Sequence, residues 1–273
     1  MLIDTHAHLN FNAYKNDLEE VIRRCLSENV WVVNVGSKYD TSKRAVEIAE
    51  GYKAGFYAAI GLHPIHSVPG LVKIKTDLEE GNFNSTEEDF DIEKYRKLAK
   101  SEKVVAIGEI GLDYYYRPKT KKKLELFKKK QKEVFLKHLD LARELNLPMI
   151  FHCRSAQDDL IEILKNNPGI QGVVHCFSGT LEQAKKYLEM GFYLGFTGII
   201  FKLDLDNIIK EIPIEKILVE TDCPYLTPLK AGSERNEPIF VKYVAKRIAE
   251  LKNIDYQKVA EITTQNAKTL FKI

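Results

Sequence analysis

Cysteine and net charge are both scarce in this 273-residue chain, and each scarcity excludes a class of protein. Four cysteines, Cys25, Cys153, Cys176 and Cys223, are too few for a disulfide scaffold, so we expect free thiols. The 41 basic and 39 acidic residues leave a net charge of only +2. The chain therefore lacks the strong positive field of non-specific nucleic-acid binders, and any polyanion must be gripped locally.

Long apolar runs and a leader segment are also lacking. No stretch approaches the length of a membrane span, and the chain starts Met-Leu-Ile-Asp-Thr-His without a basic or apolar leader region. We therefore expect no membrane contact and a cytoplasmic location, with access to a nucleus left open. The 44% hydrophobic and 29% charged residues, with ordinary amounts of glycine and proline, exclude disordered and collagen-like chains.

What is present is an alternation of short apolar runs and longer segments of helical period. Segment 18–26, for example, has the apolar stripe of a helix that covers a sheet. Because the short runs are apolar throughout, we expect parallel strands buried on both faces. The simplest closure is an α/β fold, a (β/α)₈ TIM-type barrel forming one domain over residues 1–273. The eight predicted strands are Leu2–Asp4, Val30–Val35, Phe56–Ile60, Val104–Ile107, Met149–Phe151, Gly172–Val174, Phe192–Gly195 and Ile217–Val219.

One connection is unusually long. The segment Ile65–Glu93 after the third strand contains an acidic, Asn-rich run from Gly81 to Asp91, and we interpret it as a surface insertion. Ser85 or Thr86 is predicted to cap the helix that follows, which carries Ile92, Tyr95 and Leu98.

Lysine is crowded between Lys119 and Lys132. Because these lysines flank Leu124 and Phe127, a solvated helix face is the favoured interpretation. Contact with nucleic acid is the alternative.

Histidine and carboxylate side chains gather where the predicted strands end. His6 and His8 stand two residues apart after the first strand, so both should point into the barrel mouth. Glu109, His152, His175 and Asp222 each follow another strand, at the end where barrels build active sites. Four imidazoles and two carboxylates suffice for two metal ions with one bridging carboxylate.

In these and the surrounding residues, the chain resembles the TatD-family deoxyribonucleases. The resemblance covers the whole barrel, since the matching motifs follow in family order. They are Ile3–Leu9 (IDTHAHL), Gly61–Pro64 (GLHP), Gly108–Tyr114 (GEIGLDY), His175–Gly179 (HCFSG), Glu220–Leu226 (ETDCPYL) and Arg235–Pro238 (RNEP). The resemblance implies a metal-dependent phosphodiesterase that acts on DNA, often from the 3′ end.

The resemblance also implies residue roles. One divalent ion is expected on His6, His8, Glu109 and Asp222, and a second on Glu109, His152 and His175. Glu109 would bridge the two ions, and Asp222 would accept a proton from the attacking water. The implied substrate contacts are His63 and Arg154 at the phosphate, with Asp113 and Tyr114 shaping the pocket.

Other features complete the prediction. The ions could be Mg²⁺, Mn²⁺ or Zn²⁺, and no dinucleotide or P-loop fingerprint indicates an organic cofactor. A monomer is the default oligomeric state. Two alternatives stay open, namely a hydrolase of another bond on the same scaffold, and a non-catalytic barrel that binds nucleic acid or protein through its lysine-rich helix.

Residues next to the candidate ligands also need an interpretation. Cys153, Cys176 and Cys223 directly follow candidate ligands, so strand alternation should turn them toward the helices as packing groups, with zinc coordination as the alternative. His66 and His138 do not follow strands, and we expect surface or helix positions for them.

Overall fold

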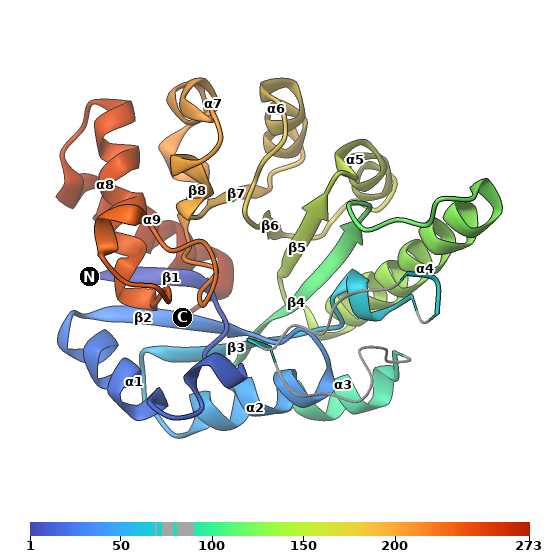
Figure 1. Cartoon of the computed structure of the whole chain (residues 1–273), viewed down its shortest axis with the longest axis horizontal. Coiled ribbons are helices and arrows are strands. Elements are labelled where there is room, and N and C mark those ends of the chain that lie inside the picture. The colour runs from blue at the N-terminus through green and yellow to red at the C-terminus, as the bar shows by residue number, and fades with distance from the viewer. Residues whose placement is uncertain (69, 73–78, 81–89) are drawn as a thin grey trace.

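Eight parallel strands form one sheet that curves into a nearly closed barrel in the computed structural model (Figure 1). Each strand pairs with the next in chain order, which confirms the predicted barrel. The structure describes all residues except 69, 73–78 and 81–89. The strands are β1 (Leu2–Ala7), β2 (Val30–Val35), β3 (Phe56–Ile60), β4 (Val104–Asp113), β5 (Met149–Arg154), β6 (Gly172–Val174), β7 (Tyr193–Phe196) and β8 (Ile217–Val219).

Helices surround this sheet (Figure 1). The buried side of α1, for instance, carries Val21, Ile22 and Cys25, which follow the predicted helical stripe. The α-helices are α1 (Leu18–Ser27), α2 (Tyr39–Glu50), α3 (Ile92–Leu98), α4 (Lys121–Leu145), α5 (Gln157–Lys165), α6 (Leu181–Glu189), α7 (Asp206–Glu211), α8 (Val241–Lys252) and α9 (Tyr256–Phe271). Short 3₁₀ helices lie at Asn12–Tyr14, Pro64–His66, Gly198–Phe201, Ile214–Lys216, Leu229–Ala231 and Pro238–Phe240.

The amino end of the barrel is closed by α9. Leu270 and Phe271 of this helix pack in one cluster with Ile3, Val33 and Leu218 from the barrel interior. Burying two such side chains stabilises the fold by about 1.5–3 kcal/mol each. This plug leaves the opposite end, where the strands finish, as the place for a site.

The barrel closes between β1 and the segment after β8. His8 N donates to Cys223 O at 2.9 Å, and Asp222 N donates to His6 O at 2.9 Å. The buried Asp4 carboxylate accepts hydrogen bonds from Thr221 N at 2.9 Å and Thr221 Oγ1 at 2.5 Å. The motif Ile3–Leu9 is thus joined to the motif Glu220–Leu226 at the barrel mouth.

Four strands extend beyond their predicted ends, namely β1 to Ala7, β4 to Asp113, β5 to Arg154 and β7 to Phe196. β4 continues to Asp113 through a register shift between Ile107 and Ile110, and β5 continues to Arg154. Glu109 and His152 therefore lie within strands, whose hydrogen bonds hold their backbone more firmly than a loop would.

The insertion after β3 is described only in part. The α3 helix begins at Ile92, and its cap is Asp91, which accepts a hydrogen bond from Glu93 N at 3.1 Å. Ser85 and Thr86, the predicted caps, lie outside the described residues. Among the helices that the structure describes, none is both long and apolar enough to cross a membrane.

Candidate metal centre

The first group of candidate ligands comes from β1, β4 and the segment after β8. His6 Nε2 lies 3.2 Å from His8 Nε2 and 3.5 Å from Glu109 Oε2. Asp222 Oδ1 is 3.4 Å from His8 Nε2 and 3.8 Å from His6 Nε2. Four side chains thus direct nitrogen or oxygen atoms at one small volume.

The second group surrounds the other oxygen of Glu109. Glu109 Oε1 lies 2.6 Å from His152 Nδ1, 3.6 Å from His63 Nε2 and 3.9 Å from His175 Nε2. The two oxygens of this single buried carboxylate therefore face two different sets of imidazoles. This is the geometry that a bridging ligand needs.

Hydrogen bonds outside the cluster fix how the imidazoles are turned. His8 Nδ1 donates to Val35 O at 2.8 Å, which directs its Nε2 toward Asp222. His152 Nε2 lies 3.1 Å from Asp113 Oδ2, and its Nδ1 faces Glu109. Such outer partners set the tautomer and the orientation of a metal-ligating histidine.

Glu220 performs the same task for His175, and its role was not predicted. Its fully buried carboxylate accepts from His175 Nδ1 at 2.9 Å and from Cys176 N at 3.0 Å, while Thr5 Oγ1 donates to Oε1 at 3.4 Å. Gly195 provides the space, because a Cβ there would lie 2.1 Å from Glu220 Oε1. The sequence signal was a glutamate directly after the eighth strand, two residues before Asp222, together with a glycine on the seventh strand.

The charges of the cluster are strongly coupled. Burial alone would raise the pKa of Glu109, but the charges of His63, His152 and His6 hold it well below its usual value. Burial would lower the pKa values of His152 and His175, but Glu109 and Asp113 raise the former to about 10, and Glu220 raises the latter to about 9.

Metal ions fit this donor set. Imidazole nitrogens and carboxylate oxygens are the ligands that zinc and manganese accept, and Asp222, whose pKa is lowered by its hydrogen bond with His8 despite burial, is ionised at neutral pH. The protons on His152 and His175 occupy the positions where a cation would bind, so binding would release them. Groups of three potential ligands, such as His6, His8 and Asp222, lie within 4.8 Å of one another.

The predicted substrate residues lie in different environments. His63 Nε2 faces Glu109, and its Nδ1 accepts a hydrogen bond from Ile65 N at 3.1 Å. Arg154 is exposed at the end of β5. Asp113 is buried against His152, so it orients a candidate ligand instead of lining an open pocket. Tyr114 is not brought to the site, because it is buried and its hydroxyl donates to Asp159 at 2.8 Å.

Two of the three thiols are packing groups, as expected. Cys153 and Cys223 are buried in the hydrophobic core cluster outside the barrel interior. The prediction is wrong for Cys176. β6 ends at Val174 and Cys176 has a φ of 45°, so strand alternation no longer applies, and its Sγ lies within 4.8 Å of candidate ligand atoms of His175 and Asp222.

The two remaining histidines are not at the surface. His66 is buried in the 3₁₀ helix after β3, and its Nε2 lies 3.0 Å from Glu80 Oε1. His138 does lie in a helix, α4, but it is fully buried, and its Nε2 accepts a hydrogen bond from Leu62 N at 3.1 Å. His66 thus joins two parts of the long connection after β3 to each other, and His138 joins the start of that connection to α4.

Comparison with known proteins identifies the family of this chain. The sequence matches the family described as TatD related DNase over residues 3–272. The chain belongs to the TatD family. It is 45% identical over 279 residues to the uncharacterized metal-dependent hydrolase YabD of Bacillus subtilis (strain 168), with 100% of each chain covered. It is 32% identical over 281 residues to the uncharacterized metal-dependent hydrolase YcfH of Escherichia coli (strain K12), covering 100% of this chain and 96% of YcfH.

Solved structures agree with the family assignment. The TatD homologue YJJV from Escherichia coli K12 superposes with a TM-score of 0.81 at 28% identity, covering 100% of this chain and 98% of YJJV. A TatD-family hydrolase from Entamoeba histolytica gives a TM-score of 0.80 at 25% identity, covering 99% of this chain and 97% of the other. This TatD-family protein is therefore a metal-dependent hydrolase with a barrel fold.

Proposed function

We propose that this TatD-family hydrolase is a deoxyribonuclease that cleaves phosphodiester bonds of DNA and removes nucleotides from the 3′ end. The observation that supports the proposal is the position of the Glu109 carboxylate, whose two oxygens face two separate groups of ligand atoms. His6, His8, Glu109 and Asp222 would hold one divalent ion. Glu109, His152 and His175 would hold a second.

Two cations bound there would supply an activated water and neutralise the charge that develops on the phosphate. Asp222 is ionised and its side chain is 18% exposed, so it can accept the proton of the attacking water from the open side of the barrel. Because burial and the nearby His152 lower the pKa of His63 to about 3, its neutral ring can hydrogen bond with a phosphate oxygen.

Arg154 supplies a positive charge for binding the phosphate. Its guanidinium lies at the rim of the mouth and can give paired hydrogen bonds to one phosphate group. Because all candidate ligands come from a single chain, we propose that the monomer is sufficient for activity. A cytoplasmic location stays a prediction.

A chelation experiment tests the proposal. The purified protein is demetallated, and hydrolysis of oligonucleotides labelled at the 5′ or the 3′ end is followed after addition of Mg²⁺, Mn²⁺ or Zn²⁺. We expect no hydrolysis without metal, restoration by at least one ion, and progressive shortening of the 5′-labelled strand from its 3′ end. Full activity of the thoroughly demetallated protein would refute the proposal, and activity on a small ester but not on DNA would indicate a different substrate.

A further inference from the structure

The positive charge of this nearly neutral protein is concentrated in one segment. Residues 117–132 contain nine basic side chains and one acidic side chain, which gives the segment a net charge of +8. Since the whole sequence carries +2, the other residues together carry −6. The low overall charge therefore hides a strongly basic surface.

Most of these basic side chains have no acidic partner. Lys128 and Lys132 pair with Asp159, at 3.7 and 3.0 Å, and Lys129 pairs with Glu133 at 3.7 Å. In the part of the chain that the structure describes, no carboxylate lies within 4.0 Å of the exposed Arg117, Lys119, Lys121, Lys122 and Lys123. Their charges are available to a polyanion.

The position of the lysines opposes helix stability. Lys121, Lys122 and Lys123 form the first turn of α4, where the helix dipole is positive, and that turn contains no acidic residue. Thr120 makes no side-chain cap bond to offset the repulsion. A cost in folding stability at this position is better explained by binding than by a solvated helix face, the interpretation that the sequence favoured.

Two exposed tyrosines connect this turn with the metal centre. Tyr115 and Tyr116 are 55% and 48% exposed, and the Arg154 guanidinium lies 3.7 Å from the Tyr115 ring centroid. Tyr115 N donates to Asp113 Oδ1 at 2.8 Å, and Asp113 in turn holds His152. Tyr115 and Tyr116 thus lie on the chain between Asp113, beside the proposed site, and the first turn of α4.

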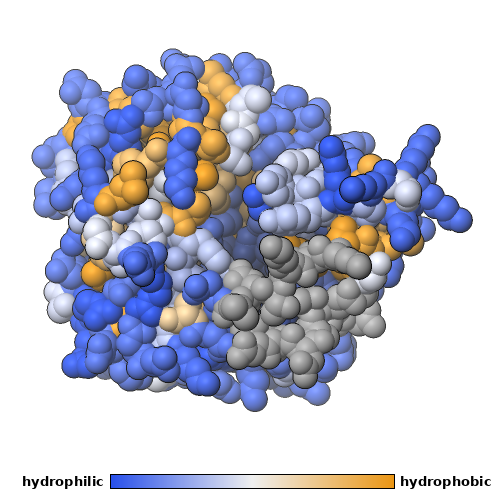
Figure 2. Space-filling view, viewed as in Figure 1, coloured by the Kyte–Doolittle hydropathy of each residue, from blue (hydrophilic) through white to orange (hydrophobic). Residues whose placement is uncertain are grey.

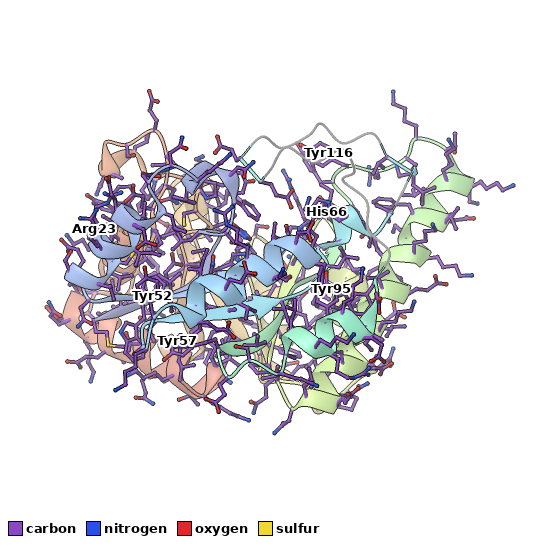
Figure 3. The ribbon with its side chains drawn as sticks, turned by 90° about the horizontal axis from the view of Figure 1, so that it is seen from below. Arg23, Tyr52, Tyr57, His66, Tyr95 and Tyr116 are labelled. Carbon is purple, nitrogen blue, oxygen red and sulfur yellow. The ribbon has the colours of Figure 1, made fainter. Side chains whose placement is uncertain are left out.

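The figures show where this surface lies. The hydrophilic end of α4 projects beyond the other helices (Figures 1 and 2). Tyr116 lies on the same side of the molecule as His66, the last residue of the 3₁₀ helix that follows β3, and Tyr57 near the start of β3 lies on the opposite side (Figure 3).

We propose that Arg154, Tyr115, Tyr116 and the basic residues 117–123, here called the basic rim, bind the nucleic-acid strand that extends from the reacting nucleotide. Lysine and arginine side chains follow the phosphates, and the tyrosine rings stack on unpaired bases. The inference rests on the proposed function, because it supposes a polynucleotide substrate. It assigns this substrate a second, longer contact outside the metal centre.

Binding as a function of salt concentration tests the basic rim. Anisotropy of labelled 12-nucleotide single strands, DNA and RNA, is measured without metal for the parent and for the triple variant Lys121→Gln, Lys122→Gln, Lys123→Gln. If each lysine neutralises one phosphate, the slope of log K against log salt concentration becomes shallower by about 2 in the variant, at roughly 0.7 per phosphate. A matched triple variant removes the exposed Lys53, Lys97 and Lys100 near the amino ends of the strands, and its slope should equal that of the parent.

The tyrosines should act differently from the lysines. Tyr115→Ala and Tyr116→Ala should each weaken binding about 5- to 100-fold while the salt slope stays unchanged, because stacking involves no counterion release. Tyr57→Ala is the control on the opposite side. The triple lysine variant should have an equal or higher melting temperature than the parent, since its glutamines are not repelled by the positive end of the helix dipole.

The outcomes separate this inference from the proposed function. Equal affinity and equal slope for the parent and the lysine variant would overturn the basic rim, even if the parent hydrolyses DNA. A shallower slope in a protein that hydrolyses no DNA would keep the rim and refute the nuclease. Unchanged oligonucleotide binding together with lost binding to anionic phospholipid vesicles would also overturn the inference, in favour of a membrane surface.

Discussion

Glu220 offers the most informative single perturbation of the metal centre, because it touches no proposed ion. Three donors converge on its two buried oxygens, namely His175 Nδ1, Cys176 N and Thr5 Oγ1. In Glu220→Gln, the amide oxygen can keep the bonds from His175 Nδ1 and Cys176 N, while the NH₂ group faces Thr5 Oγ1, whose hydroxyl can accept from it and donate to Val219 O at 3.2 Å. His175 also loses the negative charge that raises its pKa to about 9.

The expected magnitude follows from these contacts. Loss of an outer partner of a ligating histidine lowers metal affinity by about 10- to 100-fold, or about 1.4–2.7 kcal/mol. Replacing the charged acceptor of two buried N–H groups by a neutral amide oxygen weakens both hydrogen bonds, which costs about 1–3 kcal/mol of folding stability in total. We therefore expect weaker metal binding and a lower melting temperature in the same variant.

Competition with a chromophoric chelator measures the metal affinity, and thermal unfolding measures the stability. Glu189→Gln is the matched control, because Glu189 is exposed at the end of α6 and the substitution removes the same charge. Its metal affinity should equal that of the parent. Excess metal should restore much of the activity of Glu220→Gln, since every proposed ligand is still present.

Gly195→Ala tests the same contact without changing a polar side chain. The new Cβ would lie 2.1 Å from Glu220 Oε1 and 2.3 Å from its Cδ, so the carboxylate must move away from His175. We expect a loss of metal affinity similar to that of Glu220→Gln. Parent-like affinity in both variants would refute the idea that Glu220 orients a ligand.

Three further predictions address the proposed base, a buried histidine and a thiol. Asp222→Asn keeps the shape and an oxygen ligand but removes the proposed base, so steady-state kinetics on an oligonucleotide should show kcat lower by about 10²- to 10⁴-fold. A variant with full metal content that turns over at the parent rate would show that Asp222 takes no part in proton transfer. Burial lowers the pKa of His138 from 6.5 to about 3, so its neutral form stabilises the fold above pH 6.5 and this contribution, up to about 5 kcal/mol, is lost as the pH falls toward 3. Urea unfolding should therefore show a smaller acid destabilisation for His138→Gln than for the parent, and equal pH dependence would contradict the assignment. Cys153→Ala should cost about 1 kcal/mol of stability in the same assay and leave the metal content of the protein unchanged, whereas lost metal would show that the thiol is a ligand.

The strands could be predicted from the sequence because a strand that is buried on both faces is a short run of apolar residues. Gly172–Val174 and Ile217–Val219 were predicted with the observed bounds, since each is a short apolar run between polar segments. The ends of β1, β4 and β5 were placed too early, and β7 begins and ends one residue later than predicted. Glycine, glutamate, histidine and arginine interrupt the apolar runs of β4 and β5, but neighbouring strands continue to pair with them through a bulge.

The candidate ligands were also predictable, for a topological reason. In a parallel barrel all strands finish at one end, so His6, His8, Glu109, His152, His175 and Asp222 had to gather once the eight strands were recognised. Residue type and position at a strand end are enough to find these ligands. For this reason the family resemblance and the residue pattern led to the same six candidate residues.

Only the tertiary structure decided how these side chains are turned and what surrounds them. Asp4 holds Thr221 across 217 residues of sequence, and Glu220 holds His175 across 45, so no local pattern could show either contact. Tyr114 turns outward to Asp159, and Cys176 turns toward the site, because backbone beyond a strand no longer alternates. The sequence by itself determined the barrel and the gathering of the ligands, since periodicity and strand direction are local properties. Orientation was decided by packing and hydrogen bonds between distant segments, which exist only in the folded chain.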